Sequence, residues 1–139
     1  MKFYFDSSAL TKRYISEKGS DLIDRFFLEA ESVVVSSICL PEIISALSRL
    51  RREKKLDIHQ YNQCKRAAIE DFASFEVCQL SPEVLKTTIT ILEHSELRAA
   101  DALHVASAIE AKASRFVSSD ARQIAVAKKF NLTVDSILT

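Results

Sequence analysis

Residues 2–10 read KFYFDSSAL, a short apolar run that ends abruptly on an aspartate. The run Lys2–Phe5 is rich in aromatic residues, which predicts a buried β-strand. Asp6, followed by Ser7, fits a cap for a helix that begins directly after this strand. We therefore expect the chain to open with a strand that leads into a helix.

Similar apolar runs recur along the chain, each short and rich in β-branched or aromatic residues. Between them lie longer segments with helical spacing, such as Ile43, Ile44, Leu47 and Leu50. Strands that alternate with helices predict an α/β fold with a parallel sheet. The expected strands are Lys2–Phe5, Ser32–Val35, Phe75–Gln79, Phe116–Val117 and Leu132–Val134.

Local signals mark the start of several helices. Ser81 and Pro82 have the form of an N-cap followed by proline in the first turn, and Asp57 opens a capping box. The stretch from Pro41 to Ala73 has no strand signal, so we expect two successive helices, broken near residues 56–58. They should form a helical arm beside the sheet.

Composition limits the class of protein. The chain has 139 residues, of which 47% are hydrophobic and 27% charged, as in an ordinary globular domain, and we expect one domain spanning residues 1–139. The formal net charge is zero, so the chain as a whole has no electrostatic attraction to nucleic acid. A single glycine leaves no glycine-rich loop for nucleotide phosphates.

The cysteines and the N-terminal residues indicate the cellular compartment of the protein. Three widely spaced cysteines without a C-x-x-C pair favour buried thiols over disulfides or a zinc site. The first apolar run is too short for a signal peptide or a membrane span. We expect a soluble, cytoplasmic protein that does not associate with membranes.

Four carboxylates are placed where a parallel sheet would gather them. Asp6, Glu42 and Asp120 each follow an expected strand, so they should share the edge formed by the carboxyl ends of the strands. Asp101 opens a helix that begins near Ala100. Its spacing from the apolar residues of this helix puts its side chain on the apolar face, where a lone acid needs a partner. The sequence therefore predicts an acidic cluster.

Clustered carboxylates repel one another unless cations neutralise them. Oxygen ligands without a matching His or Cys set favour Mg²⁺ or Mn²⁺, ions that also bind substrate phosphates. A structural alternative exists for each acid on its own. Asp6 can cap a helix, Asp120 with Gln123 fits a capping box, and Glu42 complements a helix N-terminus.

Taken together, four short motifs resemble the PIN-domain family, especially the VapC-like toxins of type II toxin–antitoxin systems. They span nearly the whole chain, and their order and strand or helix context match those of the family. The motifs are Tyr4–Leu10 (YFDSSAL), Pro41-Glu42, Ala99–His104 (AADALH) and Phe116–Asp120 (FVSSD).

The resemblance implies a three-layer arrangement of helices, a parallel sheet of about five strands, and helices. It implies a ribonuclease that cleaves RNA phosphodiester bonds with a cation-activated water and uses Mg²⁺ or Mn²⁺. It also implies a homodimer held inactive by a cognate antitoxin protein. The matching catalytic and metal-binding positions are Asp6, Glu42, Asp101 and Asp120, and hydroxyl residues that orient them are Ser7 and Ser118.

Basic residues offer further, less specific candidates for RNA contact. The guanidinium of Arg98 lies just before Asp101 and suits a phosphate, although a surface arginine without a ligand is the common alternative. A charged run at the end of a helix could hold an RNA backbone or simply complement the helix dipole. Its candidates are Arg51, Arg52 and Lys54. His104 lies one turn beyond Asp101 and could touch the site, but a packed or hydrogen-bonded core residue is the expected role of a histidine on this helix.

Two other functions compete with the nuclease. A phosphatase would use Asp6 as a covalent nucleophile, but the D-x-D pattern is missing. A catalytically inactive binding or scaffold protein could share the fold, because a fold does not guarantee activity.

Overall fold

The computed structural model describes residues 1–137, in which five parallel strands form one central sheet in the order β3-β2-β1-β4-β5. This arrangement confirms the expected parallel α/β fold. Each strand pairs in parallel with its neighbours, for example Phe5 of β1 with Val117 of β4. The strands are β1 (Lys2–Phe5), β2 (Ser32–Ser36), β3 (Glu76–Cys78), β4 (Arg115–Ser118) and β5 (Val134–Ser136).

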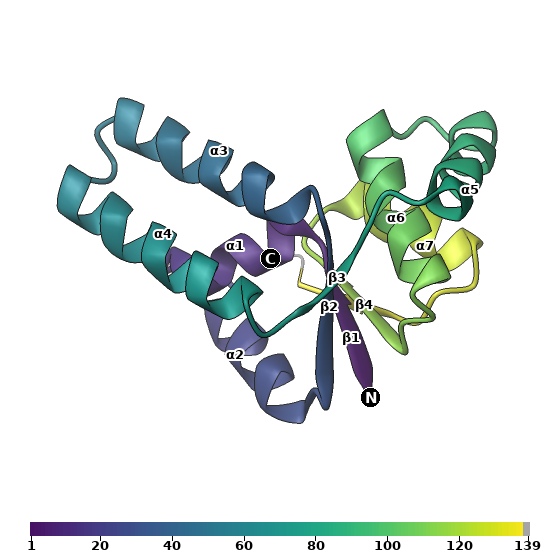
Figure 1. Ribbon diagram of the computed structural model, residues 1–139, viewed down its shortest axis with the longest axis horizontal. Coiled ribbons are helices and arrows are strands. Elements are labelled where there is room, and N and C mark those ends of the chain that lie inside the picture. Colours follow the sequence, from purple (N-terminus) through teal and green to yellow (C-terminus); the bar gives the residue numbers. More distant parts are fainter. Residues whose placement is uncertain (138–139) are drawn as a thin grey trace.

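Helices cover both faces of the sheet, which confirms the three-layer arrangement (Figure 1). One face carries α1 (Ser7–Tyr14), α2 (Ser20–Glu29), α3 (Cys39–Arg52) and α4 (Ile58–Phe72). The other face carries α5 (Pro82–Glu93), α6 (Ala99–Glu110) and α7 (Ala121–Lys129).

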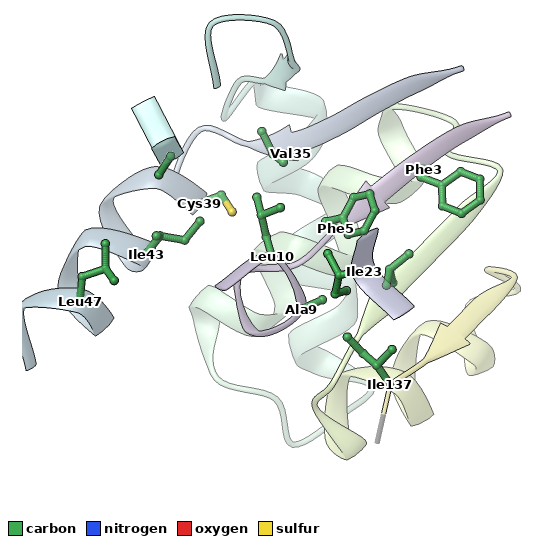
Figure 2. Packing of buried hydrophobic residues seen from close by; sticks show 12 residues of the cluster. Phe3, Phe5, Ala9, Leu10, Ile23, Val35, Cys39, Ile43, Leu47 and Ile137 are labelled. Atoms are coloured by element: carbon green, nitrogen blue, oxygen red, sulfur yellow. The ribbon is translucent and has the colours of Figure 1, made fainter. Parts of the chain in front are cut away.

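The first strand contributes to both layers of the core because successive side chains point to opposite faces. Phe3 and Phe5 pack under α1 and α2 (Figure 2), whereas Tyr4 packs on the opposite side with its ring 5.5 Å from that of Phe116. All four rings are fully buried. Burial of such a side chain stabilises the fold by about 1.5–3 kcal/mol, so β1 anchors the whole molecule.

The strand order places a switch point between β1 and β4. From β1 the chain moves outward to β2 and β3, and it then returns through α5 and α6 to β4 on the other side of β1. Ligand sites of open α/β sheets lie outside the carboxyl ends of the strands at such a point. Asp6 lies there, and its backbone N–H donates to the carbonyl of Val117 over 3.1 Å.

The expected helical arm is confirmed: α3 and α4 run side by side and extend away from the sheet (Figure 1). The break between them falls at residues 53–57, and Asp57 caps α4 in the expected capping box. Leu47 of α3 and Ile23 of α2 are fully buried in the same hydrophobic cluster. These apolar residues therefore belong to the core.

The prediction of the last strand was wrong by two residues. Leu132 does not open β5, because it ends the turn after α7: its N–H donates to the carbonyl of Ala127, and that of Asn131 to Lys128. Asn131 has φ 68°, so these residues form a Schellman motif in which the apolar residue packs back on its helix. Within residues 1–137, no helix is long and apolar enough to cross a membrane.

Candidate active site

Asp6 is the most deeply placed of the four predicted acids. It is fully buried and caps α1, with Oδ1 accepting from the backbone N–H of Ala9 (2.9 Å) and from Ser8 Oγ (2.7 Å). Oδ2 accepts from Ser118 Oγ over 2.5 Å. Burial raises the pKa of Asp6 above its ordinary value, although these hydrogen bonds and the charge of His104 act in the opposite direction.

Ser118 links two of the predicted acids. Its buried hydroxyl donates to Asp6 and accepts from the backbone N–H of Asp120 over 3.0 Å. Ser8, which the sequence reasoning did not select, binds the other oxygen of Asp6 and also accepts from the N–H of Ser119. The first helix and the end of β4 are therefore joined through one carboxylate and two hydroxyls.

Glu42 lies in the first turn of α3 and is half-buried. Its Oε1 accepts from Ser7 Oγ (2.7 Å) and from His104 Nε2 (2.6 Å). Burial alone would raise the pKa of Glu42, but the hydrogen bond and charge of His104 outweigh burial and hold the pKa below its ordinary value. Ser7 thus orients Glu42, whereas Ser8 and Ser118 orient Asp6.

Asp101 and Asp120 lie at the starts of two neighbouring helices. Asp120 caps α7 by accepting from the backbone N–H groups of Arg122 and Gln123. The capping box expected from these residues is only half formed, because the backbone N–H of Asp120 donates to Ser118 Oγ and not to Gln123, whose amide donates to Asp101 Oδ1 over 3.0 Å. Burial raises the pKa of Asp101, and the charge of Asp120 raises it further.

His104 is a core residue, as expected, and it also belongs to the site. The side chain is 1% exposed, and its ring contacts Tyr4 and Ser7 as well as Glu42. Its position one turn after Asp101 indicates contact with the site as the alternative to a core role, and the structure gives it both.

The four acids thus share one edge of the sheet, where each is held by its own partners. Among residues 1–137, no three His, Cys, Asp or Glu side chains converge closely enough to hold an ion between them. Two links connect their positions instead: Ser118 joins the carboxylate of Asp6 to the backbone N–H of Asp120, and the charge of Asp120 acts on Asp101.

The basic residues expected to contact RNA lie outside the group of four acids. Arg98 is exposed at the start of α6 and caps it without a side-chain hydrogen bond. Arg51 and Arg52 close α3, about 14 Å along the helix from Glu42 at 1.5 Å per residue, and Arg51 lies over the ring of Tyr61. Their contact with RNA stays a prediction.

Comparison with known proteins by sequence and comparison by fold point to the same family. The PIN domain family model matches residues 3–129. Ribonuclease VapC45 of Mycobacterium tuberculosis is 28% identical over 106 residues, which cover 76% of this chain and 74% of that protein.

Solved structures resemble the fold over almost its full length. FitAcB from Neisseria gonorrhoeae has a TM-score of 0.74 at 15% identity and covers 97% of each chain. VapBC-5 from Mycobacterium tuberculosis, a member of the VapBC family of toxin–antitoxin systems, has a TM-score of 0.65 at 15% identity, covering 99% of this chain and 98% of that one. With the family model matched along residues 3–129, the chain belongs to the PIN-domain family.

Proposed function

We propose that this protein is a ribonuclease that hydrolyses RNA phosphodiester bonds with Mg²⁺ or Mn²⁺ at the edge formed by Asp6, Glu42, Asp101 and Asp120. The observation that carries the proposal is the placement of four carboxylates, from four separate segments, at the switch point of a PIN-domain sheet. The relative Ribonuclease VapC45 supports the substrate class.

The donor set fits a hard cation. All four side chains offer carboxylate oxygens, and among the described residues Glu42 Oε2 has no hydrogen-bond donor. Mg²⁺ usually keeps several waters and binds through one or two carboxylates together with substrate phosphates, so a site of this kind does not require three converged acids. The charge of Asp120 raises the pKa of Asp101, which is a repulsion that a cation would relieve.

The four acids would have different roles, according to how deeply each is buried. Glu42, Asp101 and Asp120 are only partly buried and would hold the ion and orient a water. Asp6, buried with both oxygens hydrogen-bonded, would fix the inner side of the site. When bound, Mg²⁺ or Mn²⁺ would supply Lewis-acid activation and neutralise charge at the scissile phosphate.

The same geometry disfavours the phosphatase alternative. A nucleophilic Asp6 would need a free oxygen in line with a phosphate, whereas its oxygens accept from Ala9, Ser8 and Ser118 inside the core. The inactive scaffold keeps the fold but gives no reason for four acids at one edge.

We also propose that the protein is a toxin bound by an antitoxin and that it forms a homodimer. Support comes from the likeness to VapBC-5, which is described as part of a toxin–antitoxin family. Co-expression with the product of any small gene that lies beside the gene for this chain, followed by copurification and size-exclusion chromatography, tests both parts. A monomeric toxin that does not retain that product contradicts them.

The test of the nuclease is cleavage of total cellular RNA by purified protein with Mg²⁺, Mn²⁺ or EDTA. Asp6→Asn and Asp101→Asn should abolish cleavage, whereas Asp21→Asn, an exposed acid on α2, serves as a matched control and should retain it. Cleavage that survives EDTA, or that persists in both site variants, contradicts the proposal.

A further inference from the structure

A chain of hydrogen bonds crosses the sheet behind Glu42. The buried hydroxyl of Tyr4 on β1 contacts His104 Nδ1 at 2.7 Å, and Nε2 of the same ring contacts Glu42 Oε1 at 2.6 Å. Tyr4 and His104 are 0% and 1% exposed. These residues join the central strand and the two helix layers, since His104 lies on α6 and Glu42 on α3.

The hydrogen-bonding capacity of each group decides the direction of the chain. A glutamate carboxylate only accepts, so Nε2 of His104 carries a proton, and this Nε2–H group donates a hydrogen bond to Glu42 Oε1. Nδ1 faces a tyrosine hydroxyl, which can donate to a neutral ring and accept from a charged one. Burial raises the pKa of Tyr4 well above its ordinary value, so the hydroxyl keeps its proton. The Nε2–H donor therefore faces Glu42 in either state of the ring.

The consequence for Glu42 is that one oxygen is fixed and the other is left free. Oε1 is held by both His104 and Ser7, whereas no described residue donates to Oε2. The side chain of Glu42 is 35% exposed, in contrast to the buried ring behind it. Without these two donors, a half-exposed glutamate would have several rotamers to choose from.

We infer that His104, held in place by Tyr4, is a positioning residue that sets the orientation of Glu42 and directs Oε2 toward the shared acidic edge. This inference rests on the proposed nuclease function. It gives a role to a buried histidine and a buried tyrosine hydroxyl that the carboxylate mechanism does not itself use. Partners that orient a ligating carboxylate typically change activity or metal affinity about 10–100-fold when they are lost.

Two substitutions separate the donor from the ring. His104→Gln retains an N–H donor near the position of Nε2, whereas His104→Phe retains a ring of similar size without any donor. We expect His104→Phe to lower kcat about 10–100-fold, with KM changed less than about threefold, and to weaken Mn²⁺ binding by a similar factor in calorimetry. His104→Gln should recover most of both. His59→Gln, at an exposed histidine on α4, is the matched control.

Tyr4→Phe and NMR spectroscopy test the inference without any substitution of His104 itself. Only three histidines are present, so the ring N–H signals of ¹⁵N-histidine protein can be assigned by substitution. We expect a deshielded, slowly exchanging Nε2–H signal from His104 that shifts in Glu42→Gln. Tyr4→Phe should lower kcat in the same direction as His104→Phe, by a smaller factor.

The outcomes separate this inference from the proposed function. If the wild type cleaves RNA and folded His104→Phe cleaves equally well, or if His104→Gln is as impaired as His104→Phe, the positioning role is overturned and the nuclease stands. If the wild type cleaves no RNA with any cation, the nuclease fails. In that case two results overturn the positioning role independently: rapid solvent exchange of the Nε2–H of His104, or an Mn²⁺ affinity that is unchanged in His104→Phe.

Discussion

Replacement of Asp6 by two different residues separates its charge from its hydrogen bonds. Asp6→Asn and Asp6→Ala both remove the negative charge. Asparagine is also a favoured N-cap, so its Oδ1 can still accept from the N–H of Ala9, and its amide faces Ser118, whose hydroxyl can accept as well as donate. Alanine leaves the N–H of Ala9 without an acceptor and makes no hydrogen bond to Ser118 at all.

The magnitude follows from that difference. The buried N–H of Ala9 left without an acceptor costs about 1–3 kcal/mol, and the hydrogen bond lost at Ser118 costs about 1 kcal/mol. We therefore expect Asp6→Ala to unfold with a free energy about 2–4 kcal/mol below that of Asp6→Asn. In a chain of this length, 1 kcal/mol changes Tm by about 4 °C, which gives a gap of roughly 8–16 °C between the two variants. The measurement is thermal and urea unfolding followed by circular dichroism in EDTA.

The charge is tested by comparing the wild type with Asp6→Asn as a function of pH. Because burial raises the pKa of Asp6, the folded chain binds this proton more tightly than the unfolded chain does. The carboxylate therefore lowers stability at pH 7, and this penalty disappears as the pH falls through the raised pKa toward the ordinary value of 3.8. Asp6→Asn should be at least as stable as the wild type at pH 7, with the difference shrinking in acid.

Two results would refute this reasoning. Equal stability of Asp6→Ala and Asp6→Asn would mean that the hydrogen bonds to the buried carboxylate do not stabilise the fold. A wild type that is more stable than Asp6→Asn at pH 7, by an amount that grows as the pH rises, would mean that burial does not penalise the charge.

Further predictions concern neighbouring side chains. Ser118→Ala should cost about 1–3 kcal/mol in urea unfolding, because the charged Asp6 loses a donor, and Ser118→Thr should restore the loss. Gln123→Met keeps the volume but removes the amide from Asp101, so the pKa of Asp101 in EDTA, followed by ¹³C NMR of its carboxyl group, should rise further; an unchanged value would show that the amide has no influence. Leu10→Ala should cost about 2–5 kcal/mol by leaving a cavity under α1, and a loss below about 1 kcal/mol would contradict its place in the core.

The sequence alone was sufficient for the sheet, most helix starts and the edge at which the acids lie. Strand signals depend on local apolar runs, and a parallel sheet brings the ends of its strands to one edge whatever the details of packing. The Asp57 capping box and the Ser81 N-cap are likewise set by neighbouring residues. For β5 the apolar signal of Leu132 was misleading, because the same residue type also closes a Schellman motif.

Tertiary structure decided which partner each polar side chain chooses. Gln123 lies three residues after Asp120, as a capping box requires, yet its amide binds Asp101 from another helix. His104 is an apolar-face residue by its spacing, and only the approach of α3 over the end of the sheet gives it Glu42 as an acceptor. Helix periodicity and capping extend over a few residues, so the sequence determines them locally. A hydrogen bond between residues 62 positions apart depends on how whole layers pack, and no local pattern encodes it.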